Sequence, residues 1–160
     1  MRLSFGAAPN LSEDRARAAA TIDAAVGALR ARFLTDIPGQ SDAYTEKLAD
    51  CRAFIAATDP ALDDYPWVKG EALAQNMTPE AAAQFVIDTY NSWRAIGVAI
   101  ELIRLTTKRL IAEAGTANQV AMELTMGNLA LKGEDTPRVP AEVTAIIRQA
   151  LYGDDLEEVI

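Results

Sequence analysis

The sequence predicts an all-α protein, an antiparallel helical hairpin or bundle built on one long central helix at about residues 79–114, with smaller helices toward the C-terminus. Two observations support this fold class. Apolar residues recur three or four positions apart along most of the chain, which is the spacing of one face of an α-helix. Proline, glycine and short polar residues gather between these stretches, where they mark turns and helix ends.

The central helix has signals at both ends. Thr78 can cap its N-terminus, Pro79 suits the first helical position, and Gly115 can supply a left-handed residue at the other end. Two apolar strips follow the helix, so more than one surface must cover it. The first strip is either the interior of a single-chain bundle or a seam between copies of the chain. It contains Trp93, Ile96, Ile100, Ile103, Thr107, Leu110 and Ala114, and the second contains Val98, Leu102, Leu105 and Ile111.

Shorter helices are predicted before the central one. Residues 1–11 are an irregular arm, and a helix over 13–34 follows with Ser12 as its cap. A turn at 35–42 leads to a second helix, capped by Asp36 or Ser41. Residues 57–66 form a loop, and a short helix covers 69–75. The apolar face of the first helix is Ile22, Val26, Leu29 and Phe33, and that of the second is Tyr44, Leu48, Cys51 and Ile55.

The C-terminal part allows two interpretations between residues 116 and 132. Thr116 and Gln119 can form a capping box for a helix, whereas alternating apolar residues around Gly127 and Asn128 are typical of a hairpin. We favour the helix. A linker at 133–140 and a final helix ended by Gly153 follow, with an acidic tail. The predicted domains are therefore the arm 1–11, a helical domain 12–115 and a C-terminal extension 116–160.

Composition excludes several kinds of function. The chain has 15 basic and 23 acidic residues and a net charge of -8, which argues against nucleic-acid or membrane partners. It has no histidine, so the commonest general base and metal ligand is missing. Cys51 is the only cysteine and most simply fills a core position. No signal peptide or membrane span is visible, and we expect synthesis in the cytoplasm.

Carboxylates are the remaining candidates for chemistry. The adjacent pairs do not indicate a shared pocket, and Asp59 with Asp63 and Asp64 lacks the glycine turn and closing glutamate of a calcium loop. Arg104 and Lys108 can pair with Glu101 on the central helix. We therefore predict no catalytic residue, cofactor or metal. The adjacent acidic pairs are Asp63-Asp64, Asp154-Asp155 and Glu157-Glu158.

Residues 31–114 carry a series of short motifs in a fixed order. Their members are Arg32, Phe33, Ile37, Pro38, Gly39, Gln40, Tyr44, Lys47, Tyr65, Pro66, Met77, Thr78 and Trp93. With these residues the segment resembles a helical module of tail-associated and tail-fibre-associated proteins of tailed bacteriophages. The ends of the chain, 1–30 and 115–160, lie outside the resemblance.

The resemblance implies a virion structural protein without catalytic residues. On this hypothesis the chain associates with itself and with other tail or virion proteins through helical packing. It is made in the host cytoplasm and is located in the virion. Two alternatives remain open. One is a tail-assembly chaperone that is absent from the mature particle, and the other is a small cytoplasmic enzyme that uses carboxylates.

Overall fold

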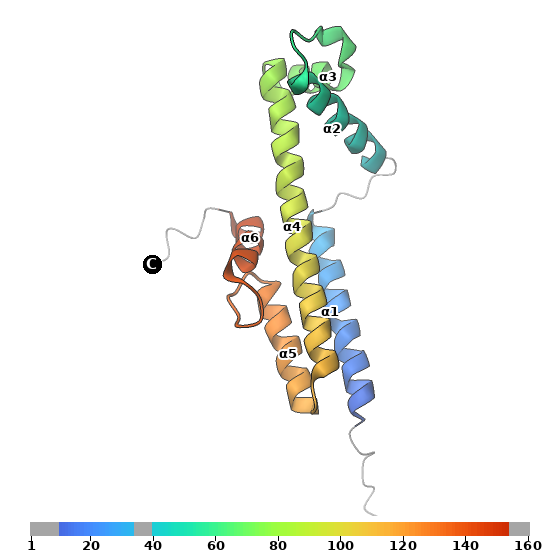
Figure 1. Ribbon diagram of the computed structural model, residues 1–160, viewed down its shortest axis with the longest axis vertical. Coiled ribbons are helices and arrows are strands. Elements are labelled where there is room, and N and C mark those ends of the chain that lie inside the picture. Colours follow the sequence, from blue (N-terminus) through green and yellow to red (C-terminus); the bar gives the residue numbers. More distant parts are fainter. Residues whose placement is uncertain (1–9, 34–39, 154–160) are drawn as a thin grey trace, which may run out of the picture. The chain divides into compact units, whose positions relative to one another are not determined.

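The computed structural model describes residues 10–33 and 40–153, and in these residues it is entirely helical, without strands (Figure 1). The predicted all-α fold on a long central helix is confirmed. A 3₁₀ turn, η1, covers Leu62–Asp64. The α-helices are α1 (Leu11–Phe33), α2 (Gln40–Ala56), α3 (Pro66–Gln75), α4 (Pro79–Glu113), α5 (Ala117–Ala130) and α6 (Ala141–Tyr152).

The chain forms two compact units that share the central helix. Among the described residues, unit 1 comprises 10–33 and 96–153, and unit 2 comprises 40–95. Helix α4 therefore contributes its first part to unit 2 and its second part to unit 1. The boundary that the sequence suggested after residue 115 lies inside unit 1.

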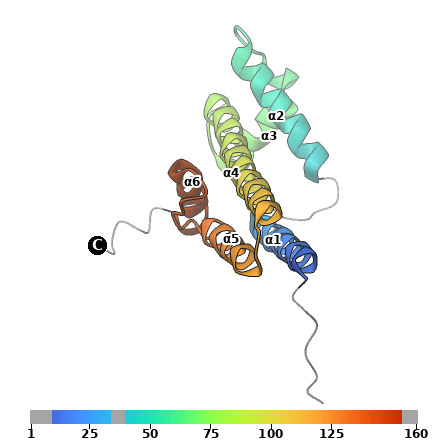
Figure 2. The ribbon, with the colours of Figure 1, turned by 60° about the horizontal axis from the view of Figure 1, so that its bottom comes forward.

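In unit 1, α1 runs antiparallel to the second part of α4 (Figures 1 and 2). Contacts at three residues of α1 show this direction. Arg15, near the start of α1, donates to the carbonyl of Ala114, and Arg30, near its end, donates to Glu101. Asp23, between them, binds both Arg104 and Lys108. Helices α5 and α6 complete the unit. Its main core contains Ile22, Val26, Leu29, Ala99, Ile100, Ile103, Ala130, Leu131, Val139 and Ile147.

Residues 117–130 form a helix, so the hairpin alternative is wrong. The Thr116 hydroxyl accepts the N–H of Gln119 at 3.2 Å, and the Gln119 side chain accepts the N–H of Gly115 at 2.8 Å. These bonds satisfy backbone donors at the start of α5. Gly115 was expected in the left-handed conformation, but the positive-φ glycines of the described chain are Gly133 and Gly153. The end of α4 is instead held by the Arg15 guanidinium on the Ala114 carbonyl.

The first helix begins at Leu11, two residues earlier than predicted. Asn10 accepts the N–H groups of Ser12 and Glu13, and its amide donates to the Glu13 carboxylate at 2.8 Å. Asn10 is thus the N-cap of α1, and the assignment of Ser12 was wrong. Thr78 does cap α4 as predicted, since its hydroxyl accepts the N–H of Ala81.

Unit 2 packs α2, α3 and the first part of α4 around a smaller core. Phe54 meets Tyr65 edge-on, with ring centroids 5.3 Å apart. The predicted apolar face of α2 included Ile55 and Tyr44, but both are exposed. Phe54 is buried in the core instead. Ser41 is the second residue of α2, and Asp36 is outside the described residues. The core contains Cys51, Phe54, Val68, Ala83 and Val86.

Helix α3 begins at Pro66, three residues before the predicted start. Its first turn is capped from another helix, because the Asp50 carboxylate in α2 accepts the N–H groups of Trp67 and Val68 at 2.9 and 3.2 Å. A carboxylate at this position also complements the positive end of the helix dipole. The capping carboxylate leaves no signal within the segment, although Pro66 at the first helical position is itself a start signal.

Candidate functional site

The predicted packing residues divide into covered and exposed groups. Ile100, Ile103 and Leu48 are buried, and Phe33 and Ile96 pack against the unit 1 core. Leu110 is partly buried. From residue 96 onward the first apolar strip is therefore the interior of unit 1. Two predicted members remain largely accessible, since Trp93 is 41% and Tyr44 is 54% exposed.

Several of the residues that carry the resemblance lie at helix ends, whereas Trp93 lies in the middle of α4. Tyr65 packs on Phe54, Pro66 opens α3, and Thr78 caps α4. Met77, directly before this cap, is exposed, and Gln40 is the first residue of α2. These positions fix where helices begin. Pro38 and Gly39 lie outside the described residues.

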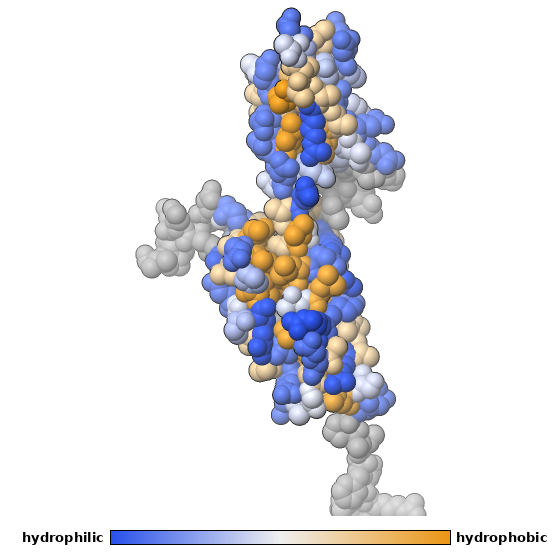
Figure 3. Space-filling view, viewed as in Figure 1, coloured by the Kyte–Doolittle hydropathy of each residue, from blue (hydrophilic) through white to orange (hydrophobic). Residues whose placement is uncertain are grey.

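Most of the second predicted strip is exposed to solvent. Ile111 is buried, but Val98, Leu102 and Leu105 are 61%, 38% and 54% exposed. We call these three residues the outer strip. They stand one helical turn apart on one face of α4 within unit 1. Orange side chains also gather over the middle of α4 and over α6 in the space-filling view (Figure 3).

A polar network joins α4 to α1 within unit 1. Asp23 accepts from Lys108 at 2.6 Å and from Arg104 at 2.7 Å, and Glu101 accepts from Arg30 at 2.6 Å. The hydrogen bond from Lys108, with a further one from Arg104, lowers the pKa of Asp23. Arg30 likewise lowers the pKa of Glu101. The sequence predicted the link of Arg104 to Glu101, but the partners on α1 required the fold.

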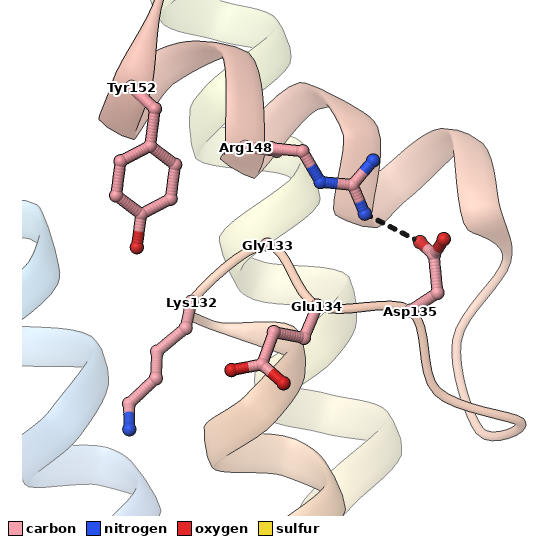
Figure 4. A pocket seen from close by; sticks show the side chains of 6 residues that line it. All are labelled: Lys132, Gly133, Glu134, Asp135, Arg148 and Tyr152. Atoms are coloured by element: carbon pink, nitrogen blue, oxygen red, sulfur yellow. Dashed lines mark hydrogen bonds and ion pairs between the residues drawn. The ribbon is translucent and has the colours of Figure 1, made fainter. Parts of the chain in front are cut away.

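A cleft of about 370 Å³ lies in unit 1 between the turn after α5 and one face of α6 (Figure 4). Arg148 points toward Asp135 and donates to it at 2.9 Å. The Thr144 hydroxyl also donates to Asp135, at 2.5 Å. These two hydrogen bonds, with Thr144 first, lower the pKa of Asp135. The cleft is lined by Lys132, Gly133, Glu134, Asp135, Arg148 and Tyr152.

The polar groups of this cleft hold the turn on the helix. Gly133 adopts a φ of 78° and lies against Arg148, where a Cβ would come within 2.7 Å of the Arg148 Cα. Only glycine fits such a position without strain. Further along, Arg138 binds Glu123 of α5 through two hydrogen bonds of 2.9 and 2.7 Å. The segment that the sequence presented as a linker is thus pinned to both α5 and α6.

The acidic residues considered for catalysis or metal binding do not converge. Asp63 pairs with Lys69 at 2.6 Å on an exposed surface, and the pairs at 154–158 lie outside the described residues. Within the described chain, no three acidic or cysteine side chains are grouped so as to hold a metal ion. Burial raises the pKa of the Cys51 thiol, which disfavours the reactive thiolate.

Comparison of the chain with models of known protein families, with curated proteins and with solved structures yields no match. In the residues that the structure describes, no helix combines the length and apolarity needed to cross a membrane. Among the exposed large apolar residues of the described chain, Val98, Leu102 and Leu105 of the outer strip share one face of α4.

Proposed function

We propose that this chain is a non-enzymatic structural protein of a tailed-bacteriophage particle, associated with the tail or tail fibre, and that it acts as an assembly or adaptor subunit through helical packing. The outer strip carries the proposal. Its three large apolar side chains form a row on the part of α4 that lies in unit 1, where Ile100, Ile103 and Ile111 are buried by the chain itself. Such a row is suited to contact with another protein.

Energetics favour a covered state for this row. Full burial of a valine or leucine side chain contributes about 1.5–3 kcal/mol relative to exposure. The chain forgoes part of this contribution at Val98, Leu102 and Leu105 when it stands alone. A neighbouring subunit that packs on these residues recovers it. The buried Glu123 and Thr144 side chains of unit 1, by contrast, are hydrogen-bonded within the chain and support the fold.

The resemblance of residues 31–114 to tail-associated modules supports the phage assignment. Its motif residues occupy structural positions, since Thr78 caps α4 and Pro66 opens α3. Two of the described carboxylates have structural partners, since Asp63 pairs with Lys69 and Glu123 with Arg138. These arrangements favour an assembly role over carboxylate-dependent catalysis.

Mass spectrometry of purified particles tests the proposal. We expect peptides of this chain in a fixed ratio to a known tail protein, in particles purified by density gradient and washed at high salt. A chain that is essential for particle formation but absent from washed particles would instead be a tail-assembly chaperone. A chain that is absent and dispensable would contradict both roles.

A further inference from the structure

The outer strip belongs to a longer heptad pattern on α4. Val98, Leu102 and Leu105 are followed at the same alternating spacing of four and three by Arg109 and Ala112. Both added residues are exposed. A 4-3-4-3 repeat on an exposed face is the pattern of a seam between two α-helices, in which side chains of one helix pack between those of the other.

We propose that this face docks a second copy of the same chain, with the two α4 helices antiparallel and Leu102 of one copy opposite Leu105 of the other. The proposal rests on the assembly role inferred above and names the partner for it. Within this register Val98 lies opposite Arg109 of the second copy. The contact is a twofold, self-complementary one, which is the commonest symmetry among homo-oligomers.

Charge selects the antiparallel direction. In a parallel pair the two copies of Arg109 would meet in the same layer of the seam, and like charges there are unfavourable. In the antiparallel pair Arg109 faces the aliphatic Val98, along which its stem can pack. The flanking positions also become complementary, because Glu101 of each copy lies beside Lys108 of the other.

The flanking charges are available for such contacts. Glu101 and Lys108 keep 38% and 32% of their side-chain surface exposed while they bind Arg30 and Asp23. A second ion pair therefore adds to the existing network without replacing it. Since the apolar seam contains only three large side chains, the dimer is expected to be weak and concentration-dependent.

Sedimentation equilibrium over a range of concentrations measures the association. We expect a monomer–dimer equilibrium for the full chain and at least about tenfold weaker dimerisation for Leu102→Asp, because the charge would lie at the centre of the seam. Met122→Asp is the matched control, since Met122 is 42% exposed on α5 outside the strip. It should dimerise like the unmodified chain, with circular dichroism confirming that both variants fold.

Cysteine cross-linking tests the direction. A mixture of Leu102→Cys and Leu105→Cys chains should give mainly the mixed disulfide dimer, whereas a parallel pair would give dimers of each variant with itself. Cys51 is buried, so the unmodified chain should not cross-link. A monomer at all concentrations, equal effects of Leu102→Asp and Met122→Asp, or self-linked dimers would overturn the proposal. Presence of the chain in particles would still support the proposed function.

Discussion

Gly127 of α5 lies directly against Thr107 of α4, where a Cβ added to the glycine would come within 2.4 Å of the Thr107 hydroxyl oxygen. Both residues are buried in unit 1. The absence of a side chain at this position lets the two helices approach closely. The glycine that suggested a hairpin turn in the sequence is thus a packing residue in the middle of a helix.

Replacement of Gly127 by alanine tests this close contact. The added methyl group must displace Thr107 or shift α5, so we expect the free energy of unfolding to fall by about 1–3 kcal/mol. Denaturant titration followed by circular dichroism measures the change. Gly27→Ala in α1 is the control, because no atom lies within 4 Å of its added Cβ. There the better helix propensity should raise stability by about 0.5–1 kcal/mol.

The ion pair of Glu123 and Arg138 gives a second prediction. The Glu123 side chain is only 8% exposed, so Arg138→Met would leave a buried carboxylate without its partner. We expect a loss of about 3 kcal/mol in the free energy of unfolding. The double variant Glu123→Leu/Arg138→Met should recover most of this loss, because both charges are then removed. A double variant as unstable as the single one would show that the pair stabilises through other contacts.

The cap that Asp50 provides to α3 gives a third prediction. Asp50→Ala removes the acceptor for two N–H groups at the start of α3 and should lower the stability of unit 2 by about 1 kcal/mol. Asp50→Asn keeps an acceptor oxygen and should retain part of the effect. Hydrogen exchange of the amides of Trp67 and Val68 provides the measurement. Exchange rates unchanged in Asp50→Ala would contradict the capping role.

Acid stability should depend on Asp135. Thr144 and Arg148 stabilise its ionised form, so the pKa of Asp135 in the folded chain lies below that in the unfolded chain. This contribution to stability is complete above about pH 4 and is lost as the pH falls through the folded-state pKa. Stability measured from about pH 6 to pH 2.5 should therefore fall less steeply in Asp135→Asn than in the unmodified chain. Thr144→Val should likewise make stability fall less steeply over this acid range.

Local signals predicted most of the fold. The cap at Thr78, the capping residues Thr116 and Gln119, and the apolar spacing of α1 and α4 were sufficient to place these helices. The errors occurred where the stabilising partner comes from elsewhere in the chain. The start of α3 depends on Asp50, and the end of α4 depends on Arg15. No reading of neighbouring residues could identify either contact.

The candidate surface was only partly predictable. Periodicity separated two apolar strips on α4 but could not determine which one faces the interior. The structure buries Ile100 and Ile103 of the first strip and leaves Leu102 and Leu105 of the second in solvent. That choice depends on how α1, α5 and α6 surround the helix. The contact between Asp135 and Thr144 could not be predicted from the sequence either, because residues 133–140 have the composition of a linker.

Hydroxyl-radical footprinting of the outer strip tests the central claim, that neighbouring protein covers this face of α4. Oxidation of Val98, Leu102 and Leu105 would be compared between the chain in purified particles and the free chain at high dilution. We expect strong protection of the three side chains in the particle. Equal oxidation in both states would contradict it.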